Sequence, residues 1–537
     1  MKANSDKSKQ SNKATRRVLA GVLCGASVLS LVLSLVMPPI SQAIANDAQT
    51  VSTEETVMGG GSSSESTDVD NTNNGDTENQ NSDNVENGET DPSNGLEQNQ
   101  VEDQLEDELL GEDGKSSDDN AAMAVVEGEQ AEAASGEIDS AEKLKTELEK
   151  ASDAANFKLT KDIVTSETIQ LNKSGSIITL DLNGCKIKHE SPNQPLFNIT
   201  AGATLTVKDS QQAAPTEAMV NGVNNGNLAS MEYDGSNIPT KLTYYVTESV
   251  AKGTGTTETL KAHKADIKGA IVACGNADAT GLRLVNLFKG GTFNLESGVI
   301  TQEQNGHIGN LIYAENGSTV NMSGGYVCGA SGSGTGAGIM VSNANGGAST
   351  LKLTGGVIAG NYATNGGGVY ANGSTVNMTG GTISGNGTSK DRSGYGAGVC
   401  AVSSTVVISG GYITNNNYQF YSDNEGSTKH IGNGCHGGGG IAAFNSGSLT
   451  INGGFITGNY SAEAGGGIYA GAWNQALSLF SFSGGSIASN VAQNSEGGGI
   501  RIAAPTVGEF NVIGKKAYIT NNTTNTPNDW GGGGVFV

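Results

Sequence analysis

A glycine-rich motif that returns about every 30 residues constrains the fold of this chain more than any other feature. One copy, residues 366–386, reads GGGVYANGSTVNMTGGTISGN. Each copy has two apolar residues separated by one position, then small residues, then an aliphatic residue. The apolar pairs are Phe293/Leu295, Val320/Met322, Leu351/Leu353, Val376/Met378, Val406/Ile408, Leu449/Ile451, Phe480/Phe482 and Phe510/Val512. The aliphatic residues are Ile300, Val327, Ile358, Ile383, Ile413, Ile456, Ile487 and Ile519, and a looser early copy has Leu180, Leu182, Gly184 and Ile187. Self-similarity at such a period is the sequence signature of stacked repeats.

Each copy predicts three short strands and three corners. Alternation at period two places both residues of an apolar pair on one face of a strand. The Gly-Gly that follows permits backbone angles that turn a corner. The segment Gly-Gly-Gly-Val-Tyr-Ala supplies a third strand, with Val369 pointing inward. One coil cannot bury its own apolar side, but stacked coils can. The sequence therefore predicts an all-β fold, a three-sided parallel β-helix solenoid.

An asparagine follows the aliphatic residue by three positions in six copies. These residues are Asn361, Asn386, Asn416, Asn459, Asn490 and Asn522. Stacked amides can form a ladder that satisfies buried polar groups at a corner. A ladder is therefore the main interpretation, and a ligand-binding row is the alternative.

The first 135 residues differ in composition from the repeat region. Basic residues precede an uncharged stretch at residues 18–37, and Ala43-Ile44-Ala45 matches a small-x-small cleavage site. Residues 1–45 are therefore predicted to be a signal peptide, and an uncleaved membrane anchor is the alternative. Residues 46–135 hold 25 Asp and Glu against one Lys and no aromatic residue, which predicts a disordered acidic linker. The expected location is outside the cell.

A short helix is predicted over residues 136–156, before the first coil. Asp139 and Glu142 have the spacing of a capping box. Leu144 and Leu148 follow on one face at helical spacing. We expect this helix to cap the first coil, because an uncovered strand edge is an aggregation hazard.

The predicted β-helix occupies residues 157–537. Residues 211–266 break its pattern with two prolines and a polar alternating stretch, which predicts an insertion on the side of the main body. The last residues, GGGGVFV, are the opening third of another coil. We therefore expect a truncated C-terminal end and a longer natural protein.

The motif resembles the right-handed parallel β-helix repeats of bacterial surface proteins, which share the shape of the pectate-lyase-like superfamily. GGGVY and the Ile-Ser-Gly-Asn ending at Asn386 resemble the GGA-I and F-x-x-N motifs of chlamydial polymorphic outer-membrane proteins, with Ile in place of Phe. Residues 178–188 and 205–210 are similar to the opening coils of exported repeat proteins of Gram-positive bacteria. The resemblance covers residues 138–537 and implies an adhesin or a surface spacer at the cell surface or cell wall.

The distribution of titratable residues argues against catalysis. β-Helix enzymes that degrade polysaccharides need clustered carboxylates. Residues 290–537 contain only three aspartates and seven glutamates, and Gly306-His307-Ile308-Gly309 echoes a polygalacturonase motif without its aspartates. We expect no catalytic residue, metal or cofactor, and we interpret His430, Cys435 and His436 as a plain loop. The cysteines, which form no CxxC pair, are expected to be buried thiols.

Two columns of residues are predicted to point outward, one residue per coil. The first column is Met340, Tyr370, Cys400, Ala442, Tyr469, Arg501 and Phe536, and the second is Val299, Tyr326, Val357, Thr382, Tyr412, Phe455, Ser486 and Tyr518. Exposed aromatic residues at regular spacing can stack on sugar rings or contact a protein. The alternative is that these residues simply favour strands and cover apolar surface.

Two long corners are the preferred candidate binding site, because loops on a rigid scaffold carry function. Residues 415–436 contain Tyr418, Phe420 and Tyr421, and residues 471–476 contain Trp473. We expect both to lie on neighbouring coils and to contact a glycan or a host or bacterial protein. The predicted function is thus a non-catalytic extracellular adhesin; a polysaccharide lyase or hydrolase and a passive spacer are the alternatives. No basic run lies beyond the first 17 residues, so nucleic-acid binding is not expected.

Overall fold

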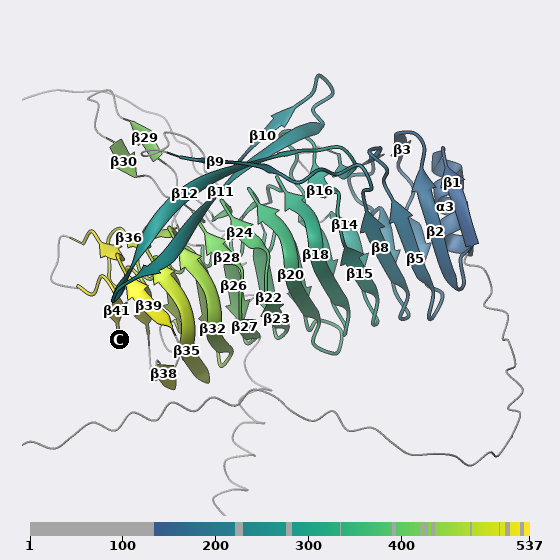
Figure 1. Ribbon diagram of the computed structural model, residues 1–537. Coiled ribbons are helices and arrows are strands. Elements are labelled where there is room, and N and C mark those ends of the chain that lie inside the picture. Colours follow the sequence, from purple (N-terminus) through teal and green to yellow (C-terminus); the bar gives the residue numbers. More distant parts are fainter. Residues whose placement is uncertain are drawn as a thin grey trace, which may run out of the picture. The chain divides into compact units, whose positions relative to one another are not determined.

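The computed structural model describes residues 134–220, 229–274, 282–332, 334–388, 394–417, 420–422, 428–430, 435–472, 475–503, 505–510, 516–526 and 531–537. The predicted signal peptide and nearly all of the predicted acidic linker therefore lie outside the described residues. In this part of the chain the structure is nearly all β-strand, arranged in long stacked sheets of parallel strands (Figure 1).

Each coil after the first, which holds only β1 and a helix, contributes one strand to each of three parallel ladders, here called the first, second and third sides. The first side consists of β1 (Ala134–Ile138), β2 (Ala154–Leu159), β5 (Ile177–Asp181), β8 (Thr204–Lys208), β15 (Thr292–Leu295), β18 (Thr319–Cys328), β20 (Thr350–Ala359), β23 (Thr375–Met378), β27 (Thr405–Ile408), β32 (Ser448–Thr457), β35 (Leu479–Ala488) and β38 (Gly508–Phe510). The second side consists of β3 (Ile163–Thr165), β6 (Lys186–His189), β13 (Ala270–Ala273), β16 (Val299–Gln302), β24 (Thr382–Ser384), β28 (Tyr412–Thr414), β39 (Ala517–Thr520) and the C-terminal halves of β18, β20, β32 and β35. The third side consists of β4 (Ile169–Leu171), β7 (Phe197–Ile199), β14 (Arg283–Leu287), β17 (Asn310–Ala314), β19 (Ile339–Ser342), β22 (Val369–Asn372), β26 (Val399–Val402), β31 (Ile441–Phe444), β34 (Ile468–Ala470), β37 (Ile500–Ile502) and β41 (Val535–Phe536).

Smaller ladders lie at the corner between the second and third sides. β21 (Tyr362–Ala363) pairs with β25 (Gly387–Thr388), and β33 (Tyr460–Ser461), β36 (Val491–Ala492) and β40 (Thr523–Thr524) form a three-stranded ladder. β18, β20, β32 and β35 run through their Gly-Gly corner as one bent strand. The second glycine of each pair has a positive φ, for example 78° at Gly381, which only glycine adopts without strain. This stacking of coils is compatible with a β-helix solenoid.

The register of the ladders confirms most of the predicted repeat alignment. Val376 lies opposite Val406, and Ile383 lies opposite Ile413. Two alignments are wrong by two residues. Phe482, rather than Phe480, lies opposite Phe510, and the early copy aligns Ile178 and Leu180 with Leu205 and Val207. A slip of two residues preserves the inward face of a strand, so alternation alone cannot detect it.

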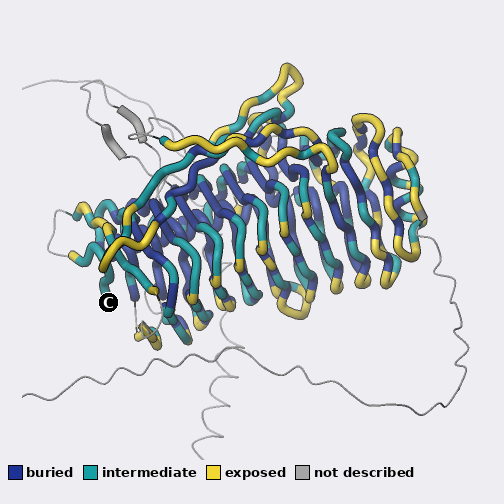
Figure 2. Tube along the Cα trace, viewed as in Figure 1, coloured by how far each residue is buried: buried dark blue, intermediate teal, exposed yellow. Residues whose placement is uncertain are grey.

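The interior of the stack is apolar along its whole described length (Figure 2). Its members come from all three sides, for example Phe293, Ile300 and Ile312, each fully buried. Burial of such residues is the dominant favourable contribution to folding. Exposed residues gather at the turns and on one antiparallel element that lies across the stack (Figure 2).

The predicted asparagine ladder is confirmed. The Asn416 side chain donates from Nδ2 to Oδ1 of Asn459 at 3.0 Å and to the Ile383 carbonyl at 2.9 Å. Its Oδ1 accepts from the Asn386 side chain at 3.0 Å and from the Asn386 backbone N–H at 3.1 Å. The amide-to-amide bond recurs at 2.9–3.0 Å from Asn361 to Asn522. The ladder thereby satisfies polar groups that are buried at the corner after the second side.

A helix, α3 (Ala141–Lys150), follows the first strand. It is shorter than the predicted segment 136–156, because β1 and β2 pair with each other on either side of it. The predicted cap at Asp139 is wrong, since the Ser140 side chain accepts the N–H of Lys143. Leu144 and Leu148 are buried, as expected for one apolar face.

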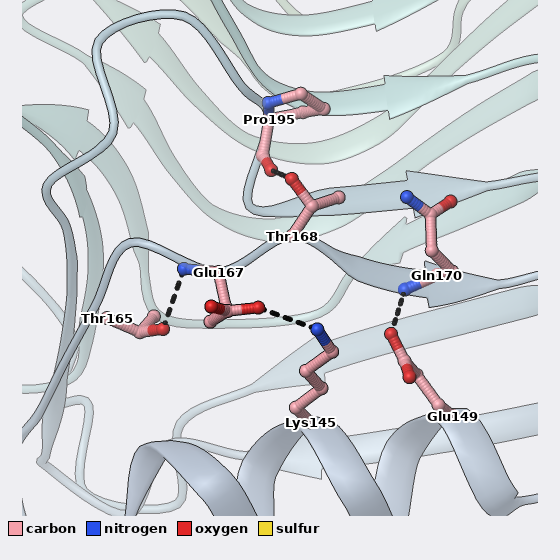
Figure 3. A network of polar contacts seen from close by, with 7 residues as sticks. All are labelled: Lys145, Glu149, Thr165, Glu167, Thr168, Gln170 and Pro195. Atoms are coloured by element: carbon pink, nitrogen blue, oxygen red, sulfur yellow. Dashed lines mark hydrogen bonds and ion pairs between the residues drawn. The ribbon is translucent and has the colours of Figure 1, made fainter.

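Polar contacts fix the exposed side of this helix to the strands beside it (Figure 3). The ammonium group of Lys145 lies 2.7 Å from a carboxylate oxygen of Glu167. The Gln170 backbone N–H donates to Glu149 at 2.9 Å. Gln170 lies in β4 and Glu167 lies just before it, so the helix lies against the third side at the first coils.

The segment predicted as an insertion forms a four-stranded antiparallel sheet, here called the strap. Its strands are β9 (Thr216–Met219), β10 (Ala229–Tyr233), β11 (Pro239–Lys252) and β12 (Gly255–Asp266), in the order β10-β11-β12-β9. The long hairpin β11–β12 lies lengthwise across the second side (Figure 1). The insertion leaves the stack after β8 and returns at β13, that is, at the corner between the first and second sides.

Candidate functional site

The two predicted loops belong to neighbouring strands of the third side. Residues 415–436 lead into β31, and residues 471–476 follow β34. β31 and β34 pair in parallel, with Ile441 opposite Ile468. The loops therefore attach to opposite ends of two paired strands, separated by roughly 10–13 Å for strands of three to four residues.

The predicted site residues are only partly within the described chain. Tyr418 and Trp473 lie outside the described residues. Phe420 and Tyr421 lie in β29 (Phe420–Ser422), which pairs antiparallel with β30 (Thr428–His430). Contact between the two loops stays a prediction.

A cluster of four rings lies on the outer face of the third side between the roots of these loops. The ring of Tyr395 lies 5.1 Å from that of His436, 5.5 Å from that of Phe444 and 5.8 Å from that of Tyr469, measured between centroids. His436 and Tyr469 meet edge-on at 6.4 Å. These separations are typical of favourable aromatic pairs. We refer to these four residues as the aromatic cluster.

Sequence reasoning missed Tyr395 as a site residue and placed His436 only in a loop. Both residues directly precede a glycine-rich segment that leads into a third-side strand. The isolated bridge between Tyr395 and Gly437 brings successive runs side by side. A Cβ on Gly437 would lie 2.5 Å from the Tyr469 ring, so only glycine lets the chain pass this close. An aromatic residue directly before a glycine-rich segment was therefore the sequence pattern that could have indicated these two residues.

An ion pair borders the aromatic cluster. Nε of Arg501 lies 2.6 Å from a carboxylate oxygen of Glu496, and its guanidinium carbon lies 4.8 Å from the centre of the Tyr469 ring. Burial opposes ionisation of Glu496, but hydrogen bonds from Ser495 and Arg501 outweigh it and lower its pKa. Burial raises the pKa of Tyr395 to about 12. At neutral pH the Tyr395 hydroxyl is therefore protonated, and the negative charge of Glu496 is paired with the positive charge of Arg501.

The predicted exposure of the first outward column is wrong. Tyr370 is 7% exposed and Tyr469 is 4% exposed, although both point away from the interior. The corner segments that carry Tyr395 and His436 fold over them and form a second apolar layer with Cys400 and Ala442. The alternative interpretation, that these side chains cover apolar surface, is the one that burial supports.

The second outward column is also covered, but by the strap. Val299, Tyr326 and Val357 pack with Tyr244 and Val246 of β11. Tyr326 is 6% exposed. Tyr412 and Phe455 are stacked at 4.9 Å and half-buried. The sequence could not reveal this cover, because period-two alternation does not identify the partner of an apolar face.

A shallow groove lies on the outer face of the first side, at β1, β2, β5 and β8. Its lining includes Lys158, Asp181 and Lys208, which follow one another in the ladder. Asp181 accepts the backbone N–H groups of Asn183 and Ser210, each at 2.9 Å. Alternating charges at one coil spacing leave the groove without a dominant sign, so it does not select a charged class of ligand.

No group of three or more His, Cys, Asp or Glu suited to a metal ion occurs within the described ranges. Cys185, Cys274, Cys328, Cys400 and Cys435 are free thiols. Burial raises the pKa of Cys328 to about 12 and that of Cys435 to about 11, which keeps both thiols protonated and unreactive. The carboxylate of Glu496, which borders the aromatic cluster, accepts a hydrogen bond from Arg501.

Comparison of the chain with family models, with curated proteins and with solved structures finds no match. Within the described part of the chain, no helix has the length and apolar character that crossing a bilayer requires.

Proposed function

We propose that this chain is an extracellular adhesin without catalytic activity, built on a right-handed, three-sided parallel β-helix. The stalk would be the acidic segment 46–135, after export directed by residues 1–45, and α3 would cap the first coil. The expected location is the cell surface or cell wall of a Gram-positive bacterium. A pectate-lyase-like shape and these assignments rest on the sequence and on the resemblance stated above.

The observation that carries the proposal is the position of the aromatic cluster. It lies on a continuous parallel ladder, between the roots of two loops that contain Tyr418, Phe420, Tyr421 and Trp473. A rigid base bordered by loops rich in aromatic residues suits recognition of sugar rings, because each sugar ring offers an apolar face and a polar edge. The ligand would be a surface glycan or a host or bacterial protein, held without a metal or cofactor.

The lyase or hydrolase alternative has less support. It would need an acid and a base beside the ligand, or carboxylates for Ca²⁺. At the aromatic cluster the carboxylate of Glu496 has a lowered pKa and forms an ion pair with Arg501, so it is poorly suited to donate a proton. In a passive spacer the buried rings of Phe444 and Tyr469 would serve only to cover the third side, and the loops would bind no ligand.

A glycan array followed by titration of the best ligand tests the proposal. Replacing Tyr421 and Trp473 together by Ala should weaken binding at least tenfold. Phe510→Ala is the control, because Phe510 is an aromatic residue of the first side that is 45% exposed and packs on Phe480. Unchanged binding by the double variant would contradict the assignment of the loops. Release of reducing or unsaturated sugars from pectin-like substrates with Ca²⁺ present would favour the enzyme, and the absence of any ligand would favour the spacer.

A further inference from the structure

The strap touches coils that are far apart along the stack. In a stack of repeats each coil ordinarily contacts only its neighbours, so stability is a sum of local terms. We propose that the strap is a lengthwise clamp that makes the stability of the C-terminal coils depend on its docking at the N-terminal ones. This inference does not rest on the proposed adhesin function.

A buried aspartate fixes the root of the strap. Asp209, 3% exposed, accepts the N–H of Gly269 at 2.7 Å through one carboxylate oxygen and the N–H of Gly184 at 2.7 Å through the other. Its own N–H donates to Ser297 at 2.7 Å. The two ends of the insertion are therefore fastened together and to the coils on both sides.

The near half of the hairpin, here residues 242–246 of β11, lies toward the N-terminal coils and docks through an apolar face. Leu242 is fully buried, and Tyr244 and Val246 are each 4% exposed. They pack on Val299 and Tyr326, among others, in a cluster separate from the interior of the stack. Burial of this apolar area is the main favourable contribution of the near half.

The far half, from residue 245 to the hairpin tip, docks through backbone groups along one edge of β11. The Tyr245 carbonyl accepts from Ser384 at 2.5 Å and from Asn415 at 3.1 Å. The Thr247 N–H donates to Thr414 at 3.1 Å. The Thr247 carbonyl accepts from Thr457 at 2.6 Å. Side chains of three successive coils thus form the hydrogen bonds to this edge that a neighbouring strand would otherwise form.

The hairpin tip reaches the last described coils. Ser249 and Ser486 share a hydrogen bond of 2.8 Å across 237 residues of sequence. Thr256 bonds to Thr520, and Asn521 donates to Glu258 at 2.6 Å. From β13 to β39 the second side rises by about eight coil spacings, roughly 38 Å, while the 14 residues of β11 span about 46 Å. One continuous strand is therefore long enough to join these coils.

Amide hydrogen exchange on the full chain distinguishes a clamp from a local cover. Tyr244→Ala alters the apolar face of β11. The amides of Ile456 and Ile487 lie two and three coils beyond Ser384, which the neighbouring Tyr245 carbonyl contacts. A clamp predicts at least tenfold faster exchange at these two distant amides, because weaker docking of the near half releases the far half. Tyr313→Ala is the matched control, since Tyr313 is 4% exposed on the third side of the near coils and lies away from the strap.

The control should accelerate exchange near β17 and leave the distant amides unchanged. Tyr244→Leu, a milder variant, replaces Tyr244→Ala if the latter does not fold. Unchanged exchange at Ile456 and Ile487 in a folded Tyr244 variant would overturn the clamp. Equal acceleration by Tyr313→Ala would also overturn it, because the effect would then pass from coil to coil.

Discussion

Removing one amide from the middle of the asparagine ladder should destabilise the whole stack measurably. Asn416 is fully buried and takes part in four side-chain hydrogen bonds, two as donor and two as acceptor. In Asn416→Ala the backbone N–H of Asn386 loses the oxygen that it meets at 3.1 Å. The Ile383 carbonyl loses its side-chain donor at the same time.

The size of this loss in unfolding free energy depends on which groups keep a hydrogen-bond partner. The Asn386 side chain keeps its bond to the Ile358 carbonyl, and Asn459 Oδ1 keeps the backbone N–H of residue 416. An orphaned buried donor costs about 1–3 kcal/mol, and each further lost bond costs about 0.5–1.5 kcal/mol. Three further bonds are lost besides the orphaned donor, so we expect the free energy of unfolding to fall by about 2.5–7.5 kcal/mol.

Urea unfolding followed by far-ultraviolet circular dichroism measures this loss. Asn377→Ala is the matched control, because Asn377 points outward from the first side and is half-buried. We expect the control to change the free energy of unfolding by less than about 0.5 kcal/mol. The midpoint and the slope should both be fitted, since repeat arrays can depart from two-state behaviour. Equal effects of the two substitutions would refute the reasoning, since the buried ladder would then contribute no more than a surface amide.

Two further predictions concern buried groups of the stack. Gly398→Ala should lower the free energy of unfolding by about 1–3 kcal/mol, because its Cβ would lie 2.6 Å from the Gly440 carbonyl oxygen. Gly347→Ala is the control, because its Cβ would have no atom nearer than 3.7 Å. Thermal unfolding should show a clear loss for the first variant and almost none for the second. His189 is fully buried, and burial lowers its pKa, so the unfolded chain binds a proton more readily than the folded one. Stability should therefore fall as the pH drops below about 6.5, by at most about 1.4 kcal/mol per pH unit until the folded pKa is reached. His189→Gln should lose less stability between pH 7 and pH 5 in urea titrations, and parallel losses in the two proteins would contradict this assignment.

The repeat itself was predictable because its determinants are local. Alternation fixes which face of a strand is inward, and Gly-Gly fixes the corner, so Val376 and Val406 could be aligned without a structure. The asparagine ladder was predictable for the same reason: an amide at constant distance from an inward isoleucine must recur at one corner. The alignment failed at Phe510, where the last copy is irregular and a two-residue slip leaves the pattern intact.

The covering of the outward columns was not predictable, because it depends on contacts between segments far apart in sequence. Leu242, Tyr244 and Val246 alternate, which indicates that one face of β11 needs a partner. Nothing in this pattern identifies Tyr326 as part of that partner. Tyr395 belongs to a corner, where no periodicity relates a side chain to its neighbours in space. Local patterns thus predict the scaffold of the candidate site but not which surfaces remain accessible.

The length of the strap also limits how this protein can change its number of coils. Strands of the second side recur at about 4.8 Å, whereas equivalent positions along β11 recur at about 6.6–6.8 Å. Removing one whole coil between β28 and β39 would leave the amide ladder and the interior in register, yet Ser249 and Thr256 would no longer reach the hydroxyl groups that they meet now. The length of the hairpin is thus matched to the number of coils that it crosses. Duplication or loss of a repeat beneath the hairpin would require a corresponding change in the number of residues in β11 and β12.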